Sequence, residues 1–95
     1  MANERVLFDK TEVMLTIVGK NRVSVLNVTY DKIITVQFEP IKEFKFFRMV
    51  PSEQIKIKCS GREQPVIYKR SKEKKFFDAY KTGFRKFCKD NRITF

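Results

Sequence analysis

The sequence predicts a single mainly β domain of the α+β kind, in which a seven-stranded antiparallel barrel or orthogonal sandwich is capped by one C-terminal amphipathic helix. Three observations predict this fold class. About the first 70 of the 95 residues carry short runs rich in β-branched and aromatic residues, separated by turn residues. At Ser71 the apolar spacing changes from the period of a strand to that of a helix. The length suits one domain, residues 1–95, and ten phenylalanines supply bulk for its core.

Strands are expected over about residues 4–70, joined by short connections into an antiparallel meander. The seven runs are 5–8, 11–18, 22–29, 33–39, 43–50, 53–59 and 65–70. Pro40 and Pro51 are expected to end the fourth and fifth runs, because proline cannot donate a ladder hydrogen bond. Alternation in the fourth run predicts Ile34, Val36 and Phe38 on its buried face.

The C-terminal segment predicts a helix over about residues 72–90, with Ser71 as its N-cap and Asn91 as the left-handed residue that ends it. An apolar stripe spans an arc of about 120° on this helix. Its residues are Phe76, Phe77, Tyr80, Phe84, Phe87 and Cys88. We expect the stripe to seal the open end of the barrel, and Ile93 and Phe95 to hold the tail on the body.

The composition argues against catalysis. The chain has no histidine, which removes the commonest general base and the commonest metal ligand. No glycine-rich phosphate loop occurs. Cys59 and Cys88 lack zinc-site spacing and fall on apolar faces, so they are expected to be buried free thiols. We therefore expect no enzyme, no cofactor and no metal site.

The charge of +10 points to an anionic partner, and it is concentrated towards the C-terminus. Residues 69–92 contain ten bases and three acids, whereas residues 1–50 contain eight bases and six acids. The candidate anion- or partner-binding residues are Lys20 and Arg22, in a predicted hairpin loop, and Lys74, Lys81, Arg85 and Lys89, on the predicted helix. The alternative is a merely solvated helix face whose apolar side is docked on the barrel.

Residues 43–49 combine aromatic and cationic side chains in one predicted strand. Phe44, Phe46 and Phe47 fall on both of its faces, with Lys45 and Arg48 between them. This pattern predicts core packing together with a patch for self-association. Base stacking of single-stranded nucleic acid is the alternative.

The order of the predicted elements and the sequence of residues 27–38 (NVTYDKIITVQF) resemble those of the bacterial pleckstrin-homology-like domains. In that family, two strands are joined by a Tyr-Asp-x-Ile motif. Here Tyr30, Asp31 and Ile33 occupy the corresponding positions. The resemblance implies a non-catalytic scaffold that recognises phosphoinositides, peptides or proteins. The terminal helix lacks the tryptophan usual in eukaryotic members, which argues against the phosphoinositide-binding branch. Phe84 or Phe87 could fill the same space.

These observations together predict a non-catalytic interaction module that binds a protein or peptide partner and self-associates as a homo-oligomer. Two alternatives remain open: peripheral binding to anionic lipid through the basic face, and binding of single-stranded nucleic acid. The N-terminus has no secretory apolar segment, and no apolar run approaches the roughly 20 residues of a membrane span. The expected location is cytoplasmic, peripheral to the membrane in the lipid alternative.

Overall fold

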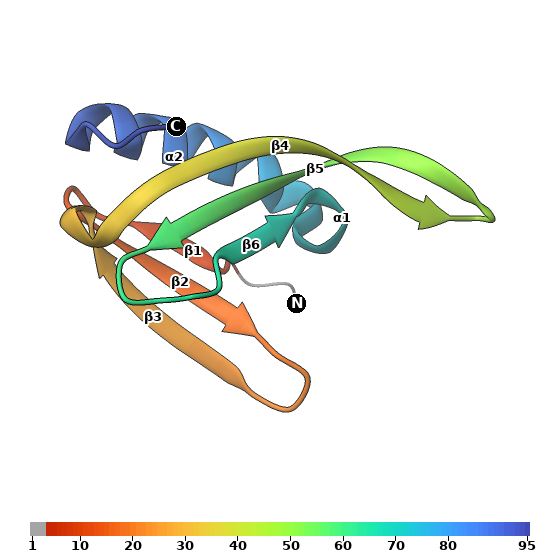
Figure 1. The fold of residues 1–95 in the computed structure, drawn as a ribbon, viewed down its shortest axis with the longest axis horizontal. Coiled ribbons are helices and arrows are strands. Elements are labelled where there is room, and N and C mark those ends of the chain that lie inside the picture. The colour runs from red at the N-terminus through yellow and green to blue at the C-terminus, as the bar shows by residue number, and fades with distance from the viewer. Residues whose placement is uncertain (1–3) are drawn as a thin grey trace.

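The computed structural model describes residues 4–95 as two three-stranded antiparallel sheets and a C-terminal helix (Figure 1). The first sheet has the order β1-β2-β3, and the second has the order β4-β5-β6. The strands are β1 (Val6–Phe8), β2 (Glu12–Val18), β3 (Val23–Thr29), β4 (Ile33–Lys45), β5 (Arg48–Cys59) and β6 (Val66–Lys69). The prediction of a mainly β fold with a C-terminal helix is confirmed. Of the expected seven-stranded barrel or orthogonal sandwich, the closed barrel and the count of seven are wrong, because six strands form two separate sheets in the described chain.

The strand count differs because the two prolines do not end strands. Pro40 pairs with Glu53 and Pro51 pairs with Lys42 within one continuous β4–β5 ladder. At both prolines the strand has a neighbour on one side only, so no second strand requires a backbone N–H there. The β4 strand is an edge strand, and β6 reaches β5 only at residues 54–57, so Pro51 lies beyond it. Three predicted strands thus become two long ones.

A change of register at the start of β4 alters which side chains face inwards. The ladder shifts between Ile33 and Thr35. As a result Ile33 and Val36 are buried, whereas Ile34 is 61% exposed. The prediction that Ile34 lies on the buried face is wrong, because the irregularity reverses the alternation at this point.

The C-terminal helix is divided in two at a residue with positive φ. A short α1 (Arg70–Glu73) is followed by the 3-10 turn η2 (Lys74–Phe76) and by α2 (Phe77–Asn91). Lys74 has φ of 53° and ψ of −120°, which is not a helical conformation, so it interrupts the expected continuous helix. Ser71 is not the N-cap, since it lies inside α1 and its hydroxyl donates to Glu43. The left-handed residue after α2 is Arg92, one position later than expected.

The apolar stripe of the helix is buried, as the sequence predicted, but it packs against two separate sheets and does not seal the end of a barrel. Phe77, Tyr80, Phe84, Phe87 and Cys88 are buried, and Phe76 is partly buried against the same core. Hydrogen bonds join the layers: the Tyr68 hydroxyl of β6 donates to the Thr16 carbonyl of β2 at 2.9 Å. The core is therefore formed between the sheets and under α2.

The tail after α2 returns to the second sheet. Ile93 is buried, and the Val36 amide donates to the Thr94 carbonyl at 3.0 Å. Phe95 is 56% exposed, but its ring lies edge-on to that of Phe38, with centroids 6.3 Å apart. The expectation that the tail is held on the body is confirmed.

The two cysteines are free and buried, as predicted. Burial raises the pKa of the Cys88 thiol to about 11 and also raises the pKa of Cys59. Both are consequently core residues with suppressed thiolate character.

Candidate functional site

The outer part of the β4–β5 hairpin projects beyond the rest of the molecule as an arm (Figure 1). We define the arm as residues 41–52. Its ladder is unbroken up to the pair Lys45–Arg48, so the arm ends in a two-residue turn made of Phe46 and Phe47. The predicted strand over residues 43–50 is thus wrong: this segment is the end of a hairpin.

The turn holds two aromatic residues in a backbone conformation that suits glycine and asparagine. Phe46 has φ of 52° and Phe47 has φ of 63°. Positive φ at both central residues is typical of a type I′ hairpin turn, which favours Asn-Gly. Each left-handed residue other than glycine costs about 1–2 kcal/mol. The sequence contains no turn residue here, so a propensity argument could not find the turn.

The tip of the arm is almost entirely apolar and exposed. Phe46 and Phe47 are 89% and 95% exposed at the turn itself. Behind them Phe44 and Met49 are paired across the strands and remain 68% and 56% exposed. We call these four residues the apolar tip. Exposed large apolar side chains that gather at one place are typical of a contact surface.

The other face of the arm carries two cations beside the apolar tip. Lys45 and Arg48 lie directly opposite each other in the ladder. Like charges in such a cross-strand pair destabilise the hairpin. Within residues 4–95, the one carboxylate within 4.0 Å of either cation is that of Glu43, whose Oε2 lies 3.9 Å from the Lys45 Nζ. The pair is therefore only partly compensated within the fold.

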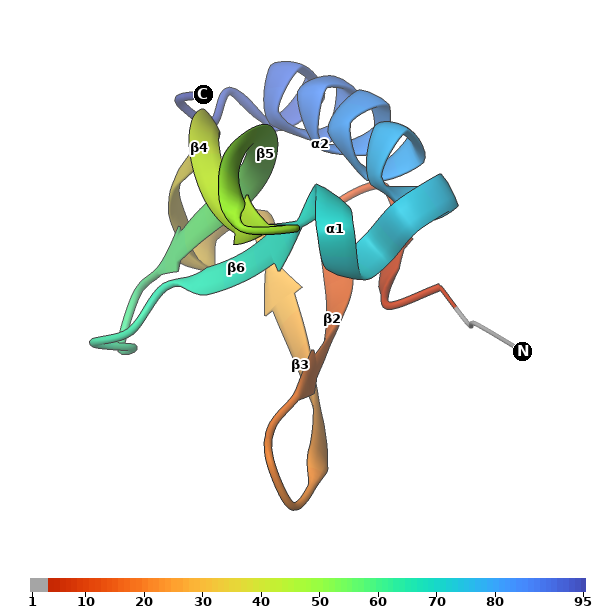
Figure 2. The same cartoon turned by 90° about the vertical axis from the view of Figure 1, so that its right-hand side faces the viewer.

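The arm is braced at its base by the short helix α1. The Ser71 hydroxyl donates to Glu43 Oε1 at 2.9 Å. Glu43 is three residues from Phe46, which corresponds to about 10 Å along a strand. Figure 2, which looks at the molecule from the side of the arm, shows α1 beside the hairpin. The arm thus extends roughly 10 Å beyond its last contact with the helical layer.

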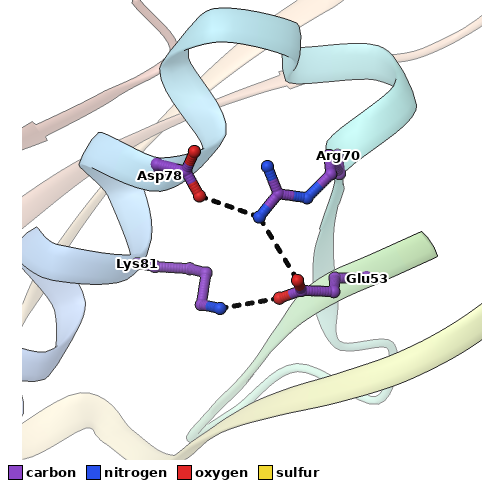
Figure 3. A network of polar contacts seen from close by, with 4 residues as sticks. All are labelled: Glu53, Arg70, Asp78 and Lys81. Carbon is purple, nitrogen blue, oxygen red and sulfur yellow. Dashed lines mark hydrogen bonds and ion pairs between the residues drawn. The ribbon is translucent and has the colours of Figure 1, made fainter.

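An ion-pair network joins β5 to the helices beside this base (Figure 3). Glu53 accepts from Lys81 Nζ at 2.7 Å and from Arg70 at 3.3 Å, and Arg70 also donates to Asp78 at 2.8 Å. The hydrogen bond from Lys81, helped by both nearby charges, lowers the pKa of Glu53. The hydrogen bond from Arg70 lowers the pKa of Asp78. Lys81, one of the candidate residues, is thus engaged within the fold.

The other candidate residues are dispersed over the molecule. Lys20 and Arg22 lie in the β2–β3 loop, which is on the opposite side of the molecule from α2 (Figure 1). Lys74 is exposed in η2. Arg85 lies over the Phe38 ring, 5.3 Å from its centroid, and Lys89 is exposed near the end of α2. The six candidate residues therefore do not form one site.

The arm was singled out by the sequence for its residue types but not for its shape. One signal could have revealed the hairpin. The residues are arranged symmetrically about the centre of the turn, with Phe44-Lys45-Phe46 on one side and Phe47-Arg48-Met49 on the other. Such a mirrored pattern places like residues opposite one another when the chain folds back at its centre.

Among residues 4–95, no helix is long and apolar enough to cross a bilayer, and no three side chains of the metal-binding types come together. Comparisons with protein-family models, curated proteins and solved structures found no match for this chain.

Proposed function

We propose that this protein is a non-catalytic module that docks on anionic membrane surfaces by inserting the apolar tip of its β4–β5 arm. The observation that carries the proposal is the exposure of Phe46 and Phe47 at the end of a projecting hairpin, beside Lys45 and Arg48. The aromatic rings enter the interfacial layer, and the cations contact lipid phosphates.

The cost of the arm within the isolated fold supports a role outside it. The turn places two phenylalanines in the left-handed region, its flanking cations oppose each other, and its largest side chains face water. Departures from local rules that gain nothing inside a fold are expected at functional sites. Insertion into a bilayer would relieve the last two of these costs, since it removes the rings from water and surrounds the cations with anions.

The dimensions of the arm suit an interfacial depth. Apolar side chains of peripheral proteins enter about 5–10 Å into the headgroup and acyl boundary. The arm extends roughly 10 Å beyond the Ser71–Glu43 contact, so full insertion of the tip brings the base of the arm to the headgroups. Burying two phenylalanine side chains contributes about 3–6 kcal/mol. Each cation near an anionic leaflet adds about 1 kcal/mol.

The shape of the tip favours a membrane over single-stranded nucleic acid. Nucleic acid binders use a basic groove in which successive bases stack on aromatic rings. Here the rings of Phe46 and Phe47 stand at a convex end, and the cations lie directly behind them. A convex apolar end with flanking cations fits a fluid, anionic surface better than a strand of bases.

Vesicle flotation tests the proposal with phosphatidylcholine alone and with 30% phosphatidylserine. The wild type is expected to float with the anionic vesicles and to be released by high salt. Phe46→Asn with Phe47→Gly gives the turn its preferred residues and removes the rings, so this variant is expected to fold and to lose flotation. Lys20→Glu, in the distant β2–β3 loop, removes a cation and is expected to retain flotation.

A tryptophan reporter tests insertion itself, because the chain has no tryptophan. Phe46→Trp is expected to show a blue-shifted emission on anionic vesicles and quenching by brominated lipid. Phe95→Trp, on the tail, is the matched control and is expected to show neither. An emission at position 46 that is unchanged by anionic vesicles, together with no flotation of the wild type, would overturn the proposal. If the wild type bound a single-stranded oligonucleotide and not the vesicles, the result would favour the nucleic acid alternative.

A further inference from the structure

A groove of about 550 Å³ lies on the body between the second sheet and the end of β2. All four residues of β6, Val66–Lys69, line it in succession. On the other side it is bounded by Thr16, Ile17 and Val18. A strand lines a groove with consecutive residues when its edge, and not one of its faces, borders the space.

The edge of β6 in this groove is available for pairing. β6 is the last strand of its sheet and pairs with β5 alone in the described chain. In an antiparallel strand, alternate residues direct their N–H and C=O groups to opposite neighbours, so half of these groups in β6 face the groove. No other strand segment of residues 4–95 has a backbone hydrogen bond with them. An unpaired edge accepts an added strand.

The inner wall of the groove is apolar. Val66 and Tyr68 are buried, and their side chains point towards the core beside Ile17. The Tyr68 hydroxyl is already used, since it donates to the Thr16 carbonyl. The inner wall therefore suits apolar side chains of a bound segment.

The rim of the groove is cationic. Arg5 and Glu73 neutralise each other there through an ion pair of 3.1 Å. Arg62, Lys69 and Lys72 are exposed and, within residues 4–95, none of the three has a carboxylate within 4.0 Å. Three uncompensated cations around one unpaired strand edge select an acidic occupant.

We propose that this groove binds an extended peptide segment of alternating apolar and acidic residues, which adds as a strand to the free edge of β6. In an added strand, side chains alternate between the two faces of the sheet. One set meets the apolar wall at Ile17 and Tyr68, and the other meets the cations of Lys69 and the rim. The partner is a protein segment of this chemistry, and the proposal does not depend on membrane binding by the arm.

Fluorescence anisotropy tests the proposal with a labelled peptide of three Glu-Val repeats and no vesicles. Saturable binding is expected, weakened at least threefold between 20 and 200 mM salt. The same peptide methylated at alternate backbone nitrogens loses the donors that an added strand needs, and it is expected to bind at least tenfold more weakly. A Lys-Val peptide of the same length is expected not to bind.

Variants locate the site. Lys69→Glu with Lys72→Glu is expected to weaken Glu-Val peptide binding at least tenfold. Lys86→Glu with Lys89→Glu makes the same charge change on exposed residues of α2 and is expected to leave the affinity within twofold. Amide chemical-shift changes on binding are expected at Val66–Lys69. No binding at 1 mM peptide, equal effects of the two double variants, or shift changes confined to the arm would overturn the proposal.

Membrane binding by the arm and peptide binding at β6 can be disproved independently of each other. The Phe46→Asn, Phe47→Gly variant is expected to bind the Glu-Val peptide with wild-type affinity, because the arm does not line the groove. Loss of peptide binding in that variant would contradict the assignment to β6, whatever the result with vesicles.

Discussion

The ring of Phe8 occupies the space that a β-carbon on Gly83 would need. A β-carbon built on Gly83 would overlap three atoms of the Phe8 ring. That ring is held edge-on to Phe84, with centroids 4.9 Å apart, and lies 6.0 Å from Phe87. The absence of a side chain at position 83 therefore allows β1 to pack closely on α2.

Gly83→Ala is expected to destabilise the fold by about 1 kcal/mol. Alanine gains about 1 kcal/mol of helix propensity, but overpacking against Phe8 costs more. In a Phe8→Ala background the clash is absent, and the same substitution is expected to stabilise by about 1 kcal/mol. Urea denaturation of the four proteins of this cycle measures both effects. Equal stabilisation in both backgrounds would show that the Phe8 ring moves aside without cost.

Lys81→Glu is expected to destabilise the fold by about 1–2 kcal/mol. The substitution removes the partly exposed ion pair between Lys81 and Glu53, and it places the new carboxylate beside that of Glu53. Lys89→Glu makes the same charge change on the same helix at an exposed position and is expected to stay within about 0.5 kcal/mol of wild type. Thermal unfolding at neutral pH measures the two variants. Equal melting temperatures for them would contradict a stabilising role for the network.

The Glu53 network also predicts an acid dependence. The pKa of Glu53 is lowered in the fold from its ordinary value of 4.5, so the folded state binds this proton less readily than the unfolded state. Its contribution to stability is complete above about pH 4.5 and is lost as the pH falls through the lowered value. The stability difference between wild type and Glu53→Gln is therefore expected to shrink below pH 4.5. Chemical denaturation at pH 7, 4 and 3 measures this stability difference. A difference that becomes larger at low pH would contradict a lowered pKa of Glu53 in the folded state.

The double substitution Phe46→Asn with Phe47→Gly is expected to raise the stability of the isolated protein by about 1–3 kcal/mol. The substitution relieves two left-handed phenylalanines, and the apolar rings lost from the tip contribute little because they are exposed. Thermal unfolding without lipid measures the change. A lower melting temperature would mean that the rings stabilise the fold itself, and it would weaken the case that the arm serves a partner.

The cysteines are expected to resist alkylation in the folded protein. Cys59 and Cys88 are buried, and the pKa of Cys88 is raised to about 11, so little thiolate is present at pH 8. Mass spectrometry after iodoacetamide treatment is expected to find both thiols unmodified without denaturant and modified in 6 M guanidinium. Rapid labelling of Cys88 in the native protein would indicate frequent opening of α2 from the sheets.

Much of the fold was predictable from local patterns. The strands β2, β3 and β6 fall within one residue of the predicted runs at each end, and the apolar stripe of α2 is buried as expected. Alternation and helical spacing record which side chains face the core, and they do so within a few neighbouring residues. Of the site, the sequence identified the aromatic and cationic residues of the arm but placed them in a flat strand.

Local patterns in the sequence were enough to predict a β-rich, strongly basic chain that ends in an amphipathic helix, with one buried thiol in a strand and one in that helix. The position of Pro40 and Pro51 inside strands could be found only from the three-dimensional arrangement, because strand order shows which strand edges need no hydrogen-bond donor. The three-dimensional arrangement also decided that Phe46 and Phe47 form a turn and that Lys81 is paired with Glu53. These outcomes depend on contacts between residues distant in sequence, which no local period encodes.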